Sequence, residues 1–270
     1  MAKARYLGFL GNPLRGKRVI ITGASSGIGE ALAVECVRLG MHVGLVARRL
    51  DLLQQLAERL REQSAGQDIR IEVAALDVTQ RERVGPVLAG LAHLLGGVDV
   101  VIANAGLLKG RELGDGRTQR DRHMFEVNVF GAIETAEAAI QLMRQQGRGG
   151  HLVAISSFSA FVPLPGNPAY SATKAALAAY FNGLRPVVAK DRIEVTVVYP
   201  GFVKTDLLNR AAPRGLPLMG RADDTAAEIM RAVAHHQPEA VVPGSLWRLL
   251  YQLQHYAPQA VLRRVQRYLP

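Results

Sequence analysis

The chain has 270 residues, 49% of them hydrophobic, which is enough to bury one sizeable core. Its single cysteine, Cys36, excludes intrachain disulfides and cysteine-based metal clusters, and the seven histidines lack metal-ligand spacing, so we expect no metal site. The net charge is +10, but nine of the 33 basic residues lie in residues 1–18 and 245–270, which contain no acidic residue. Because the basic charge is confined to the ends and the body is nearly neutral, we expect no nucleic-acid partner.

The first predicted strand, residues 17–22, runs directly into a glycine-rich turn, residues 23–29, with the sequence GASSGIG. A helix is predicted from about residue 28 to residue 39. The glycines allow a tight turn and close approach of the backbone to a ligand, and the N-terminus of the following helix presents free N–H groups to an anion. This order of strand, glycine turn and helix predicts a dinucleotide-binding site.

The same turn also matches G-x-S-x-G, the nucleophile elbow of α/β-hydrolases, with Ser25 as the nucleophile. That elbow normally follows several earlier strands, whereas this turn follows the first strand, and Gly29 has no role in an elbow. A serine hydrolase is therefore the less favoured alternative.

The second predicted strand, residues 41–47, ends at Ala47 and is followed by Arg48 and Arg49. In dinucleotide folds an acidic residue at this strand end binds the ribose 2′-OH, and an arginine there accommodates a 2′-phosphate. Basic residues are also unfavourable at a helix N-terminus, so the pair calls for another explanation. The pattern favours NADP(H) over NAD(H).

Strands and helices then alternate to the end of the body, which predicts a parallel sheet covered on both faces. The expected fold is a Rossmann-type, doubly wound α/β sheet of about seven mainly parallel strands in a single domain. The domain is predicted to span residues 16–244, between a basic N-terminal extension, 1–15, and a basic amphipathic C-terminal tail, 245–270. The remaining strands are expected at 69–76, 98–102, 152–155, 193–198 and 240–242, and the remaining helices at 50–63, 79–95, 121–146, from Pro168 onward and at 223–236.

An acid–base pair is predicted just after the fifth strand. Two serines, Ser156 and Ser157, follow that strand, and Tyr170 and Lys174 lie four residues apart on one face of the next helix. The ammonium favours the phenolate and should lower the pKa of Tyr170, while a serine could hold a substrate oxygen. Tyr-x-x-x-Lys alone is common by chance, so the rest of the chain has to support this interpretation.

Three stretches are expected to form the walls of a substrate site: residues 107–120, 158–169 and 206–221. They follow strands at the edge of the sheet where open α/β folds bind ligands. The last of them, rich in Pro, Gly and Arg, is predicted to be a lid or substrate loop.

With these motifs in this order, the chain resembles the short-chain dehydrogenase/reductase family. The resemblance runs from about residue 16 to 243 and rests on TGASSGIG (22–29), Asp77-Val78, NAG (104–106), Asn128, Ser157, Tyr170-x-x-x-Lys174, and Pro200-Gly201 with Thr205. It favours Ser157 over Ser156, because Ser157 lies 13 residues before Tyr170, as in many members.

The resemblance implies a role for each of these residues. Tyr170 is the general acid or base, Lys174 lowers its pKa and binds the nicotinamide ribose, Ser157 holds the reacting oxygen, and Asn128 supports Lys174 through a water. The implied cofactor-binding residues are Gly23, Ser25, Ser26, Gly27, Ile28, Gly29, Arg48, Arg49, Asp77, Val78, Asn104, Ala105, Gly106, Tyr170, Lys174, Pro200, Gly201, Val203 and Thr205.

The implied activity is NADP(H)-dependent interconversion of a ketone or aldehyde with an alcohol by hydride transfer. The amphipathic C-terminal tail, in turn, favours a hydrophobic or lipid-like small molecule as the substrate. A 3-oxoacyl-carrier-type reductase and a non-catalytic NADP-binding regulator are the alternatives. The family also implies a homo-oligomer, a dimer or tetramer. Pro186 departs from the pattern, and we expect the helix after Lys174 to end or kink near Arg185, so the oligomer could differ from the usual tetramer.

The C-terminal tail has leucines at helical spacing, with Trp247, Tyr251 and Tyr256 among them and arginines nearby. Three interpretations stay open: packing over the body or across a dimer, docking on an anionic membrane surface, or contact with an acidic carrier protein. Since the apolar piece at residues 6–10 is broken by glycines and a proline, we expect no signal peptide. The expected location is cytoplasmic, with membrane association as an option.

Overall fold

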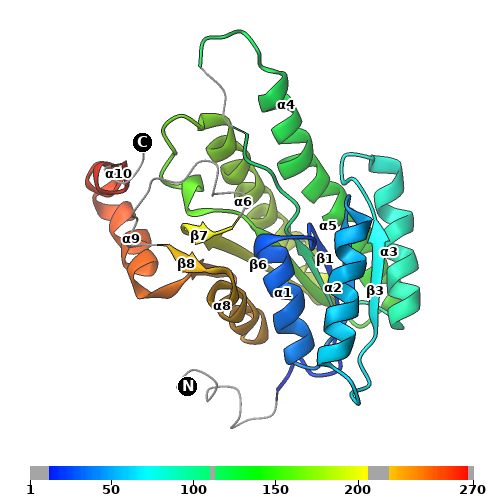
Figure 1. The fold of residues 1–270 in the computed structure, drawn as a ribbon. Coiled ribbons are helices and arrows are strands. Elements are labelled where there is room, and N and C mark those ends of the chain that lie inside the picture. The colour runs from blue at the N-terminus through cyan, green and yellow to red at the C-terminus, as the bar shows by residue number, and fades with distance from the viewer. Residues whose placement is uncertain (1–11, 110–112, 206–218, 267–270) are drawn as a thin grey trace.

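The computed structural model describes residues 12–109, 113–205 and 219–266 (Figure 1). Seven strands form one sheet in the order β3-β2-β1-β4-β5-β6-β9, and every neighbouring pair in it is parallel. Their bounds are Arg18–Thr22 (β1), His42–Ala47 (β2), Ile71–Ala75 (β3), Val100–Ala103 (β4), Gly150–Ile155 (β5), Ile193–Pro200 (β6) and Glu239–Val242 (β9). The predicted doubly wound sheet is confirmed.

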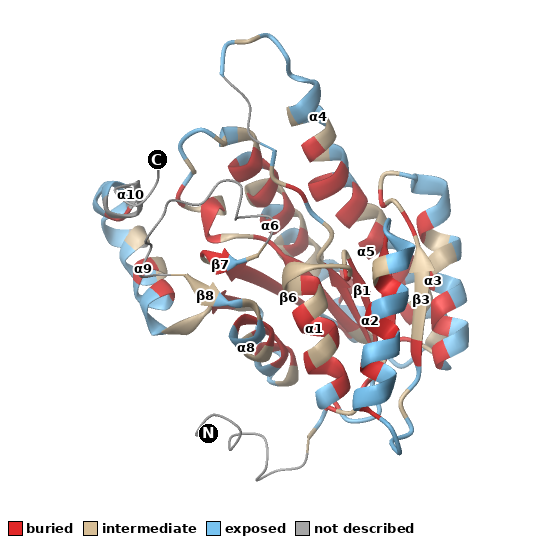
Figure 2. Ribbon diagram, viewed as in Figure 1, coloured by how far each residue is buried: buried red, intermediate tan, exposed pale blue. Residues whose placement is uncertain are grey.

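Helices cover both faces of the sheet, as Figure 2 shows by the buried sides that they turn toward it. One face packs against α1 (Gly27–Arg38), α2 (Leu50–Gln63) and α8 (Ala222–Ala234). The other packs against α3 (Arg81–Leu95), α5 (Gly131–Gln146) and α6 (Pro168–Val188). The strands are rich in valine and isoleucine because both of their faces are buried.

A chain reversal between β1 and β4 fixes the point where ligands bind in such sheets. The chain moves outward from β1 to β3 and then returns to β4 on the other side of β1. The turns after these strands therefore lie together at one sheet edge. A small separate sheet at the same end pairs β7 (Val203–Lys204) with β8 (Gly220–Arg221).

The long helix predicted over residues 121–146 is interrupted. It begins as α4 (Gln119–Phe125), passes through a π-helical segment at Glu126–Phe130, and continues as α5. Such π segments are rare in proteins, and those that occur are often found at functional sites. Asn128 is the middle residue of this segment.

Of the expected end or kink near Arg185, the end is wrong by three residues, because α6 continues through Pro186 to Val188. A proline removes one backbone donor, but here this occurs in the last turn only. The Arg185 guanidinium holds that turn by donating to the carbonyl oxygens of Val195 and Pro238 at 3.2 and 2.7 Å. Tertiary contacts therefore outweigh the local preference.

The C-terminal segment packs on the body, which is the first of the three interpretations of the tail. It forms α9 (Gly244–Tyr256) and α10 (Pro258–Gln266), beside the end of the sheet in Figure 1. Trp247, Leu250 and Val261 are buried in the same core cluster as α5 and α6. The region of the predicted lid at residues 206–218 lies outside the described residues.

Candidate active site

One deep pocket at the carboxyl ends of the strands brings together almost every residue that the sequence singled out. All the implied cofactor-binding residues line it, together with Ser157, Tyr170 and Lys174. Asn128 is the exception, since it is fully buried behind the lining. Part of the predicted wall at residues 158–169 also lines it, through Phe158, Ser159, Val162 and Leu164.

The glycine turn is built for close backbone approach. Gly23 and Gly27 have positive φ angles of 69° and 62°, which side chains disfavour. A Cβ atom on Gly29 would clash with the carbonyl of Gly23 and with the Asn104 amide nitrogen. The cap residue Ser26 makes no side-chain hydrogen bond to the helix. The first N–H groups of α1 therefore have no side-chain cap and are available to bind an anion.

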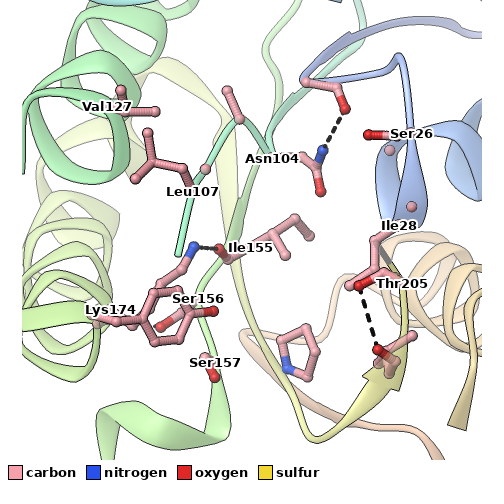
Figure 3. A pocket seen from close by; sticks show the side chains of 18 of the residues that line it. Ser26, Ile28, Asn104, Leu107, Val127, Ile155, Ser156, Ser157, Lys174 and Thr205 are labelled. Atoms are coloured by element: carbon pink, nitrogen blue, oxygen red, sulfur yellow. Dashed lines mark hydrogen bonds between the residues drawn. The ribbon is translucent and has the colours of Figure 1, made fainter. Parts of the chain in front are cut away.

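Asn104 joins the end of β4 to this turn. Its side-chain Nδ2 donates to the carbonyl oxygen of Thr22 at 3.0 Å. It also donates to the carbonyl oxygen of Gly23 at 3.2 Å, which lies in the pocket wall (Figure 3). In return, the Thr22 hydroxyl accepts from the backbone N–H groups of Asn104 and Ala105 at 3.1 and 3.2 Å. Both strand ends are thus fixed relative to each other at the point where the pocket begins.

Two arginines lie at the end of β2, where no carboxylate is present. The Arg49 guanidinium donates to the hydroxyls of Ser25 and Ser26 at 2.9 and 3.0 Å, so it reaches across the glycine turn. Arg48 is mostly exposed and lies 3.8 Å from the Asp77 carboxylate. The pocket therefore has concentrated positive charge beside the glycine turn.

Asp77 lies at the adjoining wall, after β3. Its Oδ1 accepts from the backbone N–H and the hydroxyl of Thr79, at 3.0 and 2.8 Å. Partial burial would raise the pKa of Asp77, but these hydrogen bonds and the charge of Arg48 outweigh it and lower the pKa. The carboxylate is therefore ionised and held in one orientation.

The two serines after β5 have different surroundings. The Ser156 hydroxyl donates to the carbonyl oxygen of Lys174 at 2.8 Å and is buried, so it ties β5 to α6. Ser157 extends toward the open pocket in Figure 3, accepts from the Ser159 N–H at 3.1 Å and hydrogen-bonds the Tyr170 hydroxyl. The geometry agrees with the preference for Ser157.

Lys174 is buried beside Tyr170. Its Nζ donates to the carbonyl oxygen of Ile155 at 2.8 Å and lies 5.8 Å from the centre of the Tyr170 ring (Figure 3). Burial lowers the pKa of Lys174 to about 8, because the charged form loses its hydration. The group is therefore close to the midpoint of its titration at a pH slightly above neutral.

The expected lowering of the pKa of Tyr170 is not what the structure gives. Burial raises the pKa of Tyr170 to about 12, and the hydrogen bond with Ser157 offsets only part of that rise. The reason is that Tyr170 is only 7% exposed, and the Lys174 ammonium is directed at Ile155 and not at the phenol oxygen. The neutral phenol is therefore the dominant form at neutral pH.

Asn128 is held rigidly behind the wall that carries Tyr170 and Lys174. Its Oδ1 accepts from the Leu107 N–H at 2.8 Å, and its Nδ2 donates to the Leu107 carbonyl and to the Thr173 hydroxyl at 2.9 and 3.1 Å. A Cβ on Gly106 would lie 3.4 Å from both Asn128 Oδ1 and Lys174 Nζ. Both polar groups thus approach the same glycine from the inner side of the pocket.

The remaining predicted cofactor residues follow β6. Gly201 donates its N–H to the Val242 carbonyl at 2.7 Å, and the Thr205 hydroxyl donates to the Val203 carbonyl at 3.4 Å (Figure 3). A Cβ on Gly201 would clash with the indole of Trp247. Only glycine fits at position 201, because the Trp247 ring of the C-terminal segment occupies the space that a side chain would need.

Sequence reasoning did not assign five of the lining residues to the site: Leu76, Val127, Ile155, Phe202 and Trp247. Trp247 comes from the C-terminal segment. It is 2% exposed, and its ring packs edge-on against Phe158 and Phe202 with centroids 4.9 and 5.3 Å apart. With Val162 and Leu164, these rings make the outer part of the pocket apolar. The apolar face of the predicted tail helix was the available signal, but it does not say what that face covers.

Comparisons with known proteins agree with this geometry. The family model for short chain dehydrogenases matches residues 17–214. An uncharacterized oxidoreductase of Mycobacterium tuberculosis is 36% identical over 249 residues, which cover 92% of this chain and 96% of that protein. A dehydrogenase/reductase SDR family protein 7-like of Anopheles gambiae is 32% identical, over 91% of this chain and 80% of its own.

Solved structures of the same fold are also similar. L-sorbose reductase from Gluconobacter frateurii, complexed with NADPH and L-sorbose, has a TM-score of 0.76 and 27% identity, and the match covers 86% of this chain and 97% of that one. A short-chain type dehydrogenase/reductase from Mycobacterium marinum has a TM-score of 0.77 and 28% identity, with 86% and 96% coverage. On its sequence, its parallel sheet and its pocket, the chain belongs to the short-chain dehydrogenase/reductase family of oxidoreductases.

Proposed function

We propose that the protein is an NADP(H)-dependent oxidoreductase that interconverts a ketone or aldehyde with an alcohol, and that its substrate is hydrophobic. The observation that carries the proposal is the composition of the pocket at the carboxyl ends of the strands. Ser157, Tyr170 and Lys174 line one wall, and the glycine turn with Arg48 and Arg49 lines another. We take residues 16–244 as the catalytic domain, with 1–15 and 245–270 as its extensions, and the family suggests a dimer or tetramer.

The pocket fits a dinucleotide. The glycine turn leaves room for a diphosphate, the uncapped N-terminus of α1 offers N–H donors, and Asp77 and Val78 border the next part of the wall. When bound, the nicotinamide supplies or accepts the hydride. We infer that Lys174 and Thr205 would hold the nicotinamide half, and that Asn104 helps fix the fourth strand and the cofactor.

Tyr170 is the proposed proton donor in the reducing direction. A phenol with its pKa raised to about 12 is neutral at pH 7, which is the form that a general acid needs. Ser157 is next to it and would hydrogen-bond the same substrate oxygen, so the proton is delivered to a fixed position. In the oxidising direction the phenolate form of Tyr170 would accept the proton of the alcohol, while Ser157 would hold the same oxygen.

Lys174 and Asn128 are proposed to assist Tyr170. A Lys174 ammonium with a pKa of about 8 can release and regain a proton near neutral pH. Asn128 Oδ1, which faces the same glycine as Lys174, would support it through a water, as the resemblance implies. The rigid hydrogen bonds of Asn128 suit a positioning role.

NADP(H) preference is supported by the end of β2. Ala47 stands where an NAD-binding protein would place its acid, and Arg48 and Arg49 follow it. Replacing Arg48 by alanine should raise the KM for NADPH about 10–100-fold, the equivalent of one charge-assisted hydrogen bond, and leave the KM for NADH nearly unchanged. Arg38→Ala is the control, because Arg38 is the last residue of α1 and does not line the pocket. Equal effects on both cofactors would contradict the assignment.

The central test is turnover. Purified protein with NADPH is assayed against a panel of hydrophobic ketones and aldehydes by the loss of nicotinamide absorbance. Tyr170→Phe should lower kcat at least about a hundredfold, as expected for loss of a general acid, and should still bind NADPH by fluorescence. Tyr180→Phe, on the same helix, should retain activity because its hydroxyl bonds only Glu137 at 3.0 Å.

Two results would redirect the proposal. If the whole panel gives no turnover while NADPH binds, a non-catalytic NADP-binding regulator is favoured. Activity that survives in Tyr170→Phe would refute the assigned mechanism. The serine-hydrolase alternative has little support, since the Ser25 hydroxyl accepts from Arg49, which cannot serve as a general base.

A further inference from the structure

Helix α9 has two apolar faces. The inner face carries Trp247 and Leu250, which are buried and pack on the body. The adjoining side of the helix carries four large side chains that remain exposed: Leu246, Leu249, Leu253 and Tyr256, with exposed fractions of 46, 54, 43 and 87%. Their spacing of three, four and three residues places them in one row, which we name the outer stripe. Figure 2 shows α9 with both exposed and buried segments at the edge of the molecule.

We propose that the outer stripe is the surface by which the protein docks on an anionic lipid bilayer. An interfacial helix of this kind combines an apolar row with nearby basic residues and lies in the plane of the membrane. The segment 245–270 contains four arginines and no acidic residue. Arg248 is neutralised by Glu228 at 2.7 Å, but Arg263 on α10 is exposed. No helix in the described ranges is long and apolar enough to cross a membrane, so the contact would be peripheral.

Charge favours lipid over the other occupants of an apolar row. In a twofold pair of copies, the stripe of one chain would meet the stripe of the other, which would bring together two segments that carry only positive charge. An acidic protein partner would satisfy the arginines but would leave four large apolar side chains without an explanation. An anionic bilayer offers negative headgroups and apolar chains at the same surface.

The inner face links this surface to the pocket. Trp247 lines the pocket between Phe158 and Phe202, while Leu246 and Leu249, within one turn of it, are exposed. Docking through the outer stripe would hold the apolar end of the pocket close to the membrane. An apolar substrate could then enter the pocket from the bilayer. This consequence rests on the proposed function, whereas lipid binding itself does not.

The experiment is co-sedimentation of the full chain with phosphatidylcholine vesicles, with and without phosphatidylglycerol. The wild-type protein should bind the anionic vesicles and lose much of that binding at high salt. The double variant Leu249→Glu/Leu253→Glu should bind at least about tenfold more weakly, because two half-exposed leucines no longer enter the bilayer surface and two negative charges are added. The matched control is Leu94→Glu on α3, where the leucine is 53% exposed, and it should bind like the wild type.

Two further measurements keep the outcomes separate. NADPH-dependent turnover of a water-soluble carbonyl should be the same in the double variant and the wild type, which shows that the variant is folded. If it is not, Leu249→Gln/Leu253→Gln replaces it. Equal lipid binding by variant and wild type, or no binding by the wild type, would overturn the proposal. Conversion of an oligomer to a monomer by the double variant, seen by light scattering, would assign the stripe to a second copy instead. A wild-type protein that binds the anionic vesicles but turns over no carbonyl would count only against the proposed function.

Discussion

Replacing Lys174 by methionine should make the protein more stable at neutral pH while it abolishes activity. Lys174 is buried, and its pKa is lowered from 10.5 to about 8 by desolvation. At 1.36 kcal/mol per pKa unit, holding the charged form in the folded state costs about 3 kcal/mol. Methionine has a similar length and no charge, so it removes this cost.

Part of that gain is offset. The Lys174 ammonium donates to the Ile155 carbonyl at 2.8 Å, and methionine leaves this oxygen without that donor. Losing the bond costs about 1–2 kcal/mol. Lys174→Met should therefore raise the free energy of unfolding at pH 7 by about 1–2 kcal/mol, measured by urea denaturation.

The effect has a defined pH dependence. Because the folded-state pKa lies below the unfolded-state value, the unfolded chain binds more protons between pH 8 and 10.5, and the wild type gains stability across that window. Below about pH 8 the full cost is present, and above 10.5 both states are neutral and the cost has gone. The advantage of Lys174→Met should shrink through this window and reverse at its upper end.

Lys190→Met is the matched control, since Lys190 is an exposed lysine just after α6. Its difference from the wild type should be small and should not change between pH 8 and 10.5. The reasoning is refuted if Lys174→Met is less stable than the wild type at pH 7 and the difference stays constant through the window.

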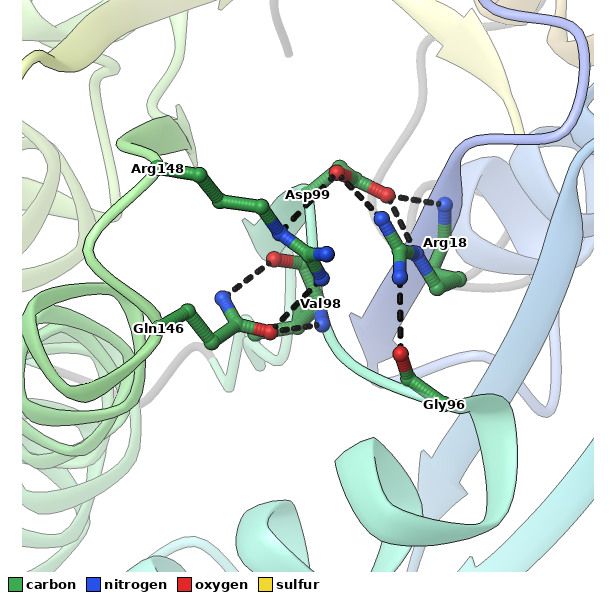
Figure 4. Close-up of polar contacts among 6 residues, drawn as sticks. All are labelled: Arg18, Gly96, Val98, Asp99, Gln146 and Arg148. Carbon is green, nitrogen blue, oxygen red and sulfur yellow. Dashed lines mark hydrogen bonds and ion pairs between the residues drawn. The ribbon is translucent and has the colours of Figure 1, made fainter.

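Two further predictions concern other polar contacts of the fold. Asp99 accepts the Arg18 guanidinium through both oxygens, at 2.6 and 2.8 Å, in a largely buried pair (Figure 4). Asp99→Ala should cost about 3 kcal/mol of unfolding free energy at pH 7 because it strands the buried charge of Arg18. Burial would raise the pKa of Asp99, but hydrogen bonds from Arg18 lower it below the ordinary value of about 4. The stabilisation is therefore present at neutral pH and is lost only as the pH falls below about 4. An unfolding-free-energy difference that is the same at pH 7 and at about pH 2 would contradict this. Ser156→Ala should lower the free energy of unfolding by about 1 kcal/mol, because it loses the bond to the Lys174 carbonyl, and it should leave kcat unchanged. Ser157→Ala should lower kcat about a hundredfold and change the free energy of unfolding little. Equal kcat values for the two variants would refute the assignment of Ser157.

Local features of the chain were enough to predict the fold. Hydrophobic runs that alternate with amphipathic stretches predicted the seven strands and the helices between them, and the bounds of α2 were predicted without error. The glycine turn at residues 23–29 and the arginines after β2 could also be predicted from the sequence, because their geometry depends on adjacent residues. Parallel connection then places every strand's carboxyl end at one edge, so the pocket's main residues follow from their positions after strands.

The features that depend on distant contacts were decided only by the tertiary structure. Pro186 stays helical because Arg185 is anchored to Val195 of β6 and to Pro238, just before β9. The pKa of Tyr170 rises instead of falling because burial depends on the whole surrounding core.

The C-terminal segment shows the same division. Its sequence specified an amphipathic helix, since helical spacing is a local property. Which of its apolar side chains would be buried was set by the place where α9 meets β6 and the turn after β5, more than forty residues away in the chain. Trp247 thereby became a wall of the pocket and the outer stripe remained exposed, because burial is a property of the assembled surface and not of the helix alone.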